Sequence, residues 1–163
     1  MQLGDSSALM SFGKVVKFLG PVLGTIGALM GIYNFRQSHP GYDLTGEWNI
    51  KNTIESTSYH PYQGLKLTYR VFLEQRGDEV SGRGEKWAEN DRVLPPVAHT
   101  PITIAGRVSG RKVTLSYEEE GTKRKSTGTF DWAYQSETNS LSGSFTATAA
   151  DARGPSIGLR SPH

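Results

Sequence analysis

One tryptophan and four arginines could together bind an anionic ligand that contains an aromatic base. An aromatic ring stacks on a base, and a guanidinium pairs with phosphate oxygens. In the predicted strand 79–87, Trp87 is out of phase with the apolar positions and adjoins a long loop. The candidate ligand-binding residues are therefore Arg70, Arg83, Trp87, Arg107 and Arg153. For each arginine the alternative is an ordinary solvent-exposed position.

The sequence carries no recognised catalytic motif. GxSxG, HExxH, GxxxxGK[ST] and a GxGxxG turn before a helix are all absent. The four histidines, at positions 39, 60, 99 and 163, are widely spaced, whereas the ligands of a zinc site must converge. Because there is no cysteine, disulfides and cysteine metal sites are excluded. We expect a protein that is not an enzyme, with no catalytic residue, no metal and no cofactor.

The charge balance argues against binding of duplex nucleic acid. Eighteen lysines and arginines against sixteen aspartates and glutamates give a net charge of +2. A nucleic-acid-binding domain is normally far more basic. Glutamates 118–120 and basic residues 123–125 face each other across Gly121. We interpret them as an ion ladder at a hairpin tip, and an anion site or a subunit contact is the alternative.

An uncharged apolar run from Phe18 to Phe35 predicts one N-terminal transmembrane helix within residues 1–37. Its 18 residues span roughly 27 Å as a helix, slightly less than the ~30 Å hydrocarbon core. The helix spans the core if Lys14 and Lys17 extend toward the headgroups and the run continues through the preceding valines. A cleaved signal peptide and a helix lying on the membrane surface are the alternatives.

Four glycines recur along this run at Gly20, Gly24, Gly27 and Gly31. Spacings of three and four residues place them on one face of a helix, and small residues let helix backbones approach closely in lipid. This face predicts helix packing between copies, and therefore a homo-oligomer. The alternative is a single anchor whose glycines have no packing role.

After a linker at residues 38–43, residues 44–163 read as an all-β domain. Turn signals separate eight segments with period-two alternation. These segments are 44–54, 65–75, 79–87, 102–109, 112–118, 125–134, 140–148 and 156–160. Eight hairpin-linked strands can close into an up-and-down antiparallel barrel, which leaves no exposed edge. A two-sheet sandwich is the alternative fold.

The domain opens with Leu44, Thr45, Gly46, Glu47 and Trp48 directly after the apolar segment. In this architecture the chain resembles the membrane-anchored β-barrel effectors of bacterial cyclic-oligonucleotide antiphage signalling (CBASS). Those effectors carry two transmembrane helices, and this chain has room for one. The opening Gly-x-Trp is also similar to that of lipocalin and avidin barrels.

The resemblance implies an antiphage defence effector in the bacterial inner membrane. We expect a single membrane pass with a cytoplasmic barrel that senses a cyclic nucleotide second messenger. Ligand binding would drive oligomerisation of the helices, which disrupts the membrane. Two other classes stay open: a membrane-tethered, lipocalin-like carrier of a small ligand, and a non-enzymatic assembly protein whose barrel binds a partner.

Overall fold

The computed structural model describes residues 41–121 and 125–162, which belong to the unit Ser38–His163. The predicted transmembrane helix and its packing glycines, Gly20, Gly24, Gly27 and Gly31, lie outside the described residues. Within the described ranges, no helix combines the length and the apolarity that a membrane span requires.

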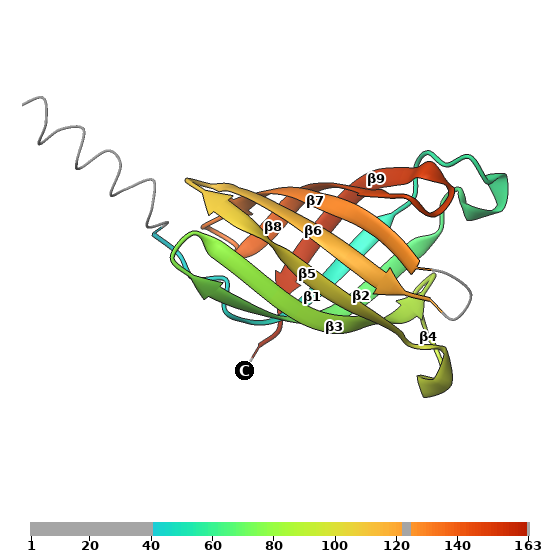
Figure 1. Cartoon of the computed structure of the whole chain (residues 1–163), viewed down its shortest axis with the longest axis horizontal. Coiled ribbons are helices and arrows are strands. Elements are labelled where there is room, and N and C mark those ends of the chain that lie inside the picture. The colour runs from blue at the N-terminus through green and yellow to red at the C-terminus, as the bar shows by residue number, and fades with distance from the viewer. Residues whose placement is uncertain (1–40, 122–124, 163) are drawn as a thin grey trace, which may run out of the picture. The chain divides into compact units, whose positions relative to one another are not determined.

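Eight long antiparallel strands form a closed barrel (Figure 1). Each strand pairs with its neighbours in the chain, and pairing of the first long strand with the last closes the ring. The sequence prediction of an eight-stranded up-and-down barrel is thereby confirmed, and the two-sheet sandwich is wrong. The strands are β1 (Gly46–Thr53), β2 (Lys66–Arg76), β3 (Glu79–Glu89), β4 (Arg92–Val93), β5 (Thr100–Ser109), β6 (Lys112–Glu120), β7 (Lys125–Gln135), β8 (Ser140–Ala147) and β9 (Ala152–Arg160).

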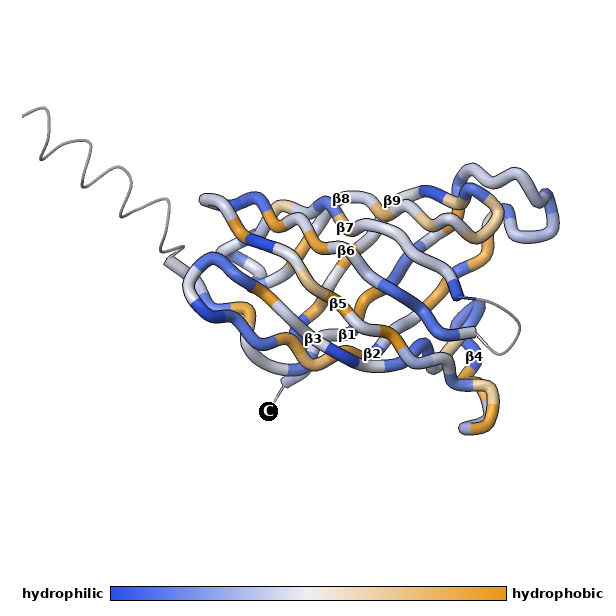
Figure 2. Tube along the Cα trace, in the orientation of Figure 1, coloured by the Kyte–Doolittle hydropathy of each residue, from blue (hydrophilic) through white to orange (hydrophobic). Residues whose placement is uncertain are grey.

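Period-two alternation decides which side chains fill the barrel. Along β6, the inward residues Val113, Leu115 and Tyr117 are buried while the residues between them face solvent. Figure 2 shows the same succession of apolar and polar residues along β5 and β6. Tight turns join the strands, and Gly77 and Gly110 occupy left-handed conformations in two of them.

One end of the barrel is closed by packed side chains. Leu44 is fully buried there, and its carbonyl oxygen accepts a hydrogen bond of 2.7 Å from Nε1 of the buried Trp48. At the same end Tyr42 stacks on Tyr134 with ring centroids 3.9 Å apart. The end of β9 and residue 41, where the described chain begins, lie at this closed end (Figure 1).

The other end carries the longer connections and is the mouth of the barrel. These connections contain three short 3₁₀ helices, η1 (His60–Tyr62), η2 (Pro96–Ala98) and η3 (Ala149–Asp151). The small strand β4 also lies here, as the return arm of a two-residue turn in which Asn90 and Asp91 both have positive φ. The sequence prediction ended the strand at residue 87 and placed a long loop directly after it, so the β3–β4 hairpin corrects it.

Strand β9 begins four residues earlier than predicted, because Pro155 is accommodated inside it. A backbone hydrogen bond between Arg153 and Ser56 shows that this part of β9 points its backbone groups toward the chain after β1. Pro155 is two residues on and points the same way, and regular β1–β9 pairing begins only at Ser156. The missing proline N–H therefore falls at an interruption of the ladder, where sheets tolerate proline.

Candidate ligand-binding site

A pocket of about 360 Å³ opens at the mouth of the barrel. We call it the mouth pocket. Its floor is the top of the packed core, and its walls come from seven strands and the connections between them. The lining residues are Ile54, Tyr62, Leu65, Leu67, Tyr69, Lys86, Glu89, Thr100, Tyr117, Glu119, Gly121, Ser126, Phe145, Ala147, Ala149 and Ala152.

A β-bulge in β3 places two charged side chains in the pocket. Lys86 pairs with Tyr69 and Ala88 pairs with Thr68, so Trp87 is an extra residue without a partner on β2. The alternation restarts after this bulge. Lys86 and Glu89, three positions apart, therefore both line the pocket, whereas strict alternation would place them on opposite faces.

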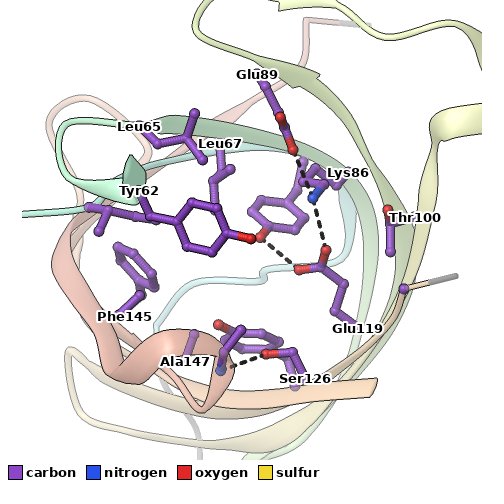
Figure 3. Close-up of a pocket in the computed structure, with 16 residues that line it drawn as sticks. Tyr62, Leu65, Leu67, Lys86, Glu89, Thr100, Glu119, Ser126, Phe145 and Ala147 are labelled. Atoms are coloured by element: carbon purple, nitrogen blue, oxygen red, sulfur yellow. Dashed lines mark hydrogen bonds and ion pairs between the residues drawn. The ribbon is translucent and has the colours of Figure 1, made fainter. Parts of the chain in front are cut away.

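These side chains join a hydrogen-bonded network across the mouth. The Lys86 ammonium lies 2.9 Å from a Glu89 carboxylate oxygen and 3.1 Å from a Glu119 carboxylate oxygen. The hydroxyl of Tyr69 donates to the other oxygen of Glu119 over 3.0 Å. The network thus ties β2, β3 and β6 together, and Figure 3 shows its members converging.

The network is mostly withdrawn from solvent. The side chains of Lys86 and Glu119 are 17% and 14% exposed. Burial works against the charge of Lys86, but the carboxylates of Glu119 and Glu89 outweigh it and raise the pKa of the ammonium above its usual value. Lys86 is therefore charged at neutral pH, and its ammonium forms ion pairs with two carboxylates.

The buried tyrosines keep their protons. Burial, together with the negative charge of Glu119, raises the pKa of Tyr69 well above its ordinary value, and the same two causes raise the pKa of Tyr117. Tyr117 donates its proton to the carbonyl oxygen of Thr146 over 2.9 Å. Both phenols are neutral donors at physiological pH, and each hydroxyl proton is already donated to an acceptor within the protein.

The opposite wall of the mouth pocket is apolar. In Figure 3, Leu65, Phe145 and Ala147 lie across the opening from Lys86 and Glu119. Phe145 belongs to the buried core, whereas Ala147 at the end of β8 is only half-buried. A molecule in the pocket would contact charged oxygens on one side and hydrocarbon on the other.

Asn52 is an unusual polar residue on the inner face of β1. It is 1% exposed, and neither its amide nitrogen nor its amide oxygen has a hydrogen-bond partner among the described residues. It pairs across the ladder with Leu67, a pocket residue, and lies two residues before Ile54, another one. A buried, unpaired amide costs about 1–3 kcal/mol, so this site beside the pocket floor is not optimised for stability alone.

Three of the five predicted ligand-binding residues gather on the outer face of β2 and β3. The Arg70 guanidinium lies 5.6 Å from the ring centroid of Trp87. Arg70 also hydrogen-bonds Glu85 over 3.1 Å, which lowers the pKa of that carboxyl. The exposed Arg83 pairs in register with Phe72, which is itself 49% exposed. We call Arg70, Phe72, Arg83 and Trp87 the outer patch.

The other two predicted residues lie apart from this patch. Arg107 is exposed near the closed end, where it pairs with Glu79 over 3.2 Å. Arg153 is exposed near the start of β9, which begins at the mouth. None of the five predicted residues lines the mouth pocket, so their assignment as ligand contacts stays a prediction about the outer wall.

The sequence prediction missed the ionisable residues of the mouth pocket. Glu119 could have been found, since it continues the inward phase of Leu115 and Tyr117. The prediction instead grouped it with the hairpin-tip glutamates, of which Glu118 does form the expected ion pair with Lys125 at 2.5 Å. Glu89 could not be placed without knowing of the bulge in β3.

The fold and the site define this part of the chain as a closed eight-stranded antiparallel barrel with a pocket at one end. No protein-family model matches the chain. No curated protein matches it either.

Proposed function

We propose that the barrel is a non-enzymatic module that binds a small molecule in the mouth pocket. The observation that carries this proposal is a cavity at the open end with an apolar wall facing a buried ionic network. Small-molecule sites are typically concave and mostly apolar, have a few convergent polar groups, and measure ~300–1,000 Å³. The mouth pocket falls at the lower end of that range, which favours a compact ligand.

The ionic network supports a binding role more directly than a structural one. Holding a lysine and two glutamates inside a barrel mouth costs desolvation that a hydrophobic set of the same volume would avoid. The unpaired amide of Asn52 beside the floor adds a further cost. Groups that lower stability in a concave site are typical of sites under selection for recognition.

Filling the cavity with a side chain tests this function. We expect Ala147→Trp to abolish saturable fluorescence enhancement of N-phenylnaphthylamine, a dye that is uncharged at neutral pH, because the indole would occupy the pocket from its half-buried rim. Ala133→Trp is the matched control, since Ala133 is exposed on the outside of β7. The measurement is a dye titration of the purified full chain. Equal dye binding by both variants would remove the mouth pocket as the ligand site.

A second candidate is the antiphage effector that the sequence resembles. In this proposal the barrel is cytoplasmic, senses a cyclic nucleotide, and triggers assembly of N-terminal helices in the bacterial inner membrane. The observation that favours it is the outer patch, where two arginines lie with the exposed Phe72 and the partly buried Trp87. Aromatic faces and guanidinium groups together suit a base and a phosphate.

Dye-loaded liposomes containing the full chain test the second candidate. Cyclic oligonucleotides should release the dye, and Arg83→Ala should abolish release because one phosphate partner is lost. Lys112→Ala, at an exposed position on the outer face of β6, should leave release unchanged. If none of the cyclic oligonucleotides releases dye from liposomes that carry the wild-type chain, the effector proposal fails.

A further inference from the structure

We propose that the ligand of the mouth pocket is a small protonated amine with a compact apolar body. The inference rests on the proposed binding function and adds to it the charge and chemical class of the ligand.

The described lining of the mouth pocket carries an unbalanced negative charge. It contains one ammonium, Lys86, and two carboxylates, Glu89 and Glu119, which leaves a net formal charge of minus one. Lys86 already lies within 3.1 Å of both carboxylates. An anion in the pocket would meet the unbalanced negative charge in a partly desolvated site, where such repulsion is poorly screened. An ammonium supplies the charge that is missing.

The two carboxylates of the pocket have more hydrogen-bond acceptor positions than the protein fills. A carboxylate has about four acceptor positions. Glu119 receives one hydrogen bond from Tyr69 and one contact from Lys86, and Glu89 receives one contact from Lys86. The hydroxyl protons of Tyr69 and Tyr117 are both used within the protein. The two carboxylates therefore favour a ligand group that donates several hydrogen bonds, as an ammonium does, while the hydroxyls of Tyr62, Thr100 and Ser126 can serve a polar atom elsewhere on the ligand.

The remaining wall of the pocket includes aromatic side chains. Tyr62, Tyr117 and Phe145 bring aromatic surface to the cavity, and aromatic surface attracts cations as well as hydrocarbon. Beside the floor, the buried amide of Asn52 is without a partner in the described chain. Asn52 pairs across the ladder with Leu67 of the pocket wall but does not itself line the pocket.

Three probes of similar size and different charge test the inference. Phenethylamine is cationic at neutral pH, phenethyl alcohol is neutral, and phenylpropionate is anionic. Each is titrated against N-phenylnaphthylamine bound to the full chain. We expect phenethylamine to displace the dye at a concentration about tenfold lower than phenethyl alcohol, the ratio that one charge-assisted hydrogen bond provides. Phenylpropionate should displace it least.

A matched pair of variants tests whether Glu119 causes the preference for phenethylamine over phenethyl alcohol. Glu119→Gln keeps the shape of the side chain and removes its charge, so phenethylamine should lose its advantage over the alcohol. Glu118→Gln should keep that advantage, because Glu118 is engaged with Lys125 at the hairpin. Buried-tryptophan fluorescence confirms that each variant is folded.

The outcomes separate the inference from the proposed function. If wild-type protein binds the dye and phenylpropionate displaces it as well as phenethylamine does, the amine inference is overturned while the binding function stands. If the wild-type chain binds the dye no better than Ala147→Trp, the binding function fails and the amine inference fails with it. Displacement by phenethylamine that depends on Glu119 supports both.

Discussion

Lys86→Met is expected to lower the free energy of unfolding at neutral pH by about 3 kcal/mol, the cost of leaving buried charge unpaired. Methionine matches the length of lysine but not its charge. The carboxylates of Glu89 and Glu119 would then face each other without the ammonium that now lies within 3.1 Å of both. Chemical denaturation of the full chain, followed by tryptophan fluorescence, measures the loss.

The pH dependence of the same variant identifies the cause. Because the pKa of Lys86 is raised in the folded state, its contribution to stability is fully present below the ordinary lysine pKa of about 10.4 and is lost as pH rises through the folded value. The wild-type chain should therefore lose stability in that alkaline window. Lys86→Met should lose less there, because only groups such as Tyr69 and Tyr117, whose pKa values are also raised, then contribute.

Lys66→Met is the matched control for this prediction. Lys66 pairs with Asp91 at the same 3.1 Å, but both side chains are more than half exposed. A pair of that kind contributes ~0–1 kcal/mol. If the two substitutions cost the same, the network in the mouth pocket has no special energetic role, and the electrostatic basis of the site is wrong.

Gly128→Ala is expected to destabilise the barrel by about 3 kcal/mol, at the upper end of what overpacking costs. A Cβ at this position would lie 2.6 Å from the ring of Tyr117 and even closer to the carbonyl oxygen of Thr146. The Thr146 carbonyl is part of the β7–β8 ladder and also accepts the Tyr117 hydroxyl, so neither neighbour can move freely. Thermal unfolding by circular dichroism measures the change.

Gly41→Ala serves as the control for the glycine prediction. An added Cβ at Gly41 would meet nothing within 4 Å, so its melting temperature should match that of the wild-type chain. A Gly128→Ala protein with unchanged stability would contradict the close approach of β7 and β8 at this point.

The local pattern of the sequence predicts most of the fold, because each strand has its own alternation and its own turn. Segments such as 112–118 carry this information in a few adjacent residues, and Gly110 marks the preceding turn. Strand ends that depend on partners are harder to predict. Pro155 reads as a strand breaker until one knows that the ladder is interrupted beside it.

The binding residues were less predictable for a physical reason. The chemistry of arginine and tryptophan makes them natural candidates for ligand contacts, but the four selected arginines face outward from their strands. Lys86, Glu89 and Glu119 form a site only because β3 and β6 come together around a closed barrel. The spacing of residues within one strand does not show which residues of another strand lie nearby, so the site is visible only in the three-dimensional structure.

The bulge at Trp87 also bears on how this strand tolerates insertions and deletions. β3 is one residue longer at this point than its pairing with β2 requires. A chain that lacked residue 87 would still turn Lys86 and Glu89 toward the inside and Ala88 toward the outside. A chain that lacked Glu85 would keep the unpaired residue 87. On one side of that deletion, side chains that face the interior would face outward, and those that face outward would face the interior. Residue 87 therefore adds an indole to the outer wall at a position where length can vary without disturbing the interior.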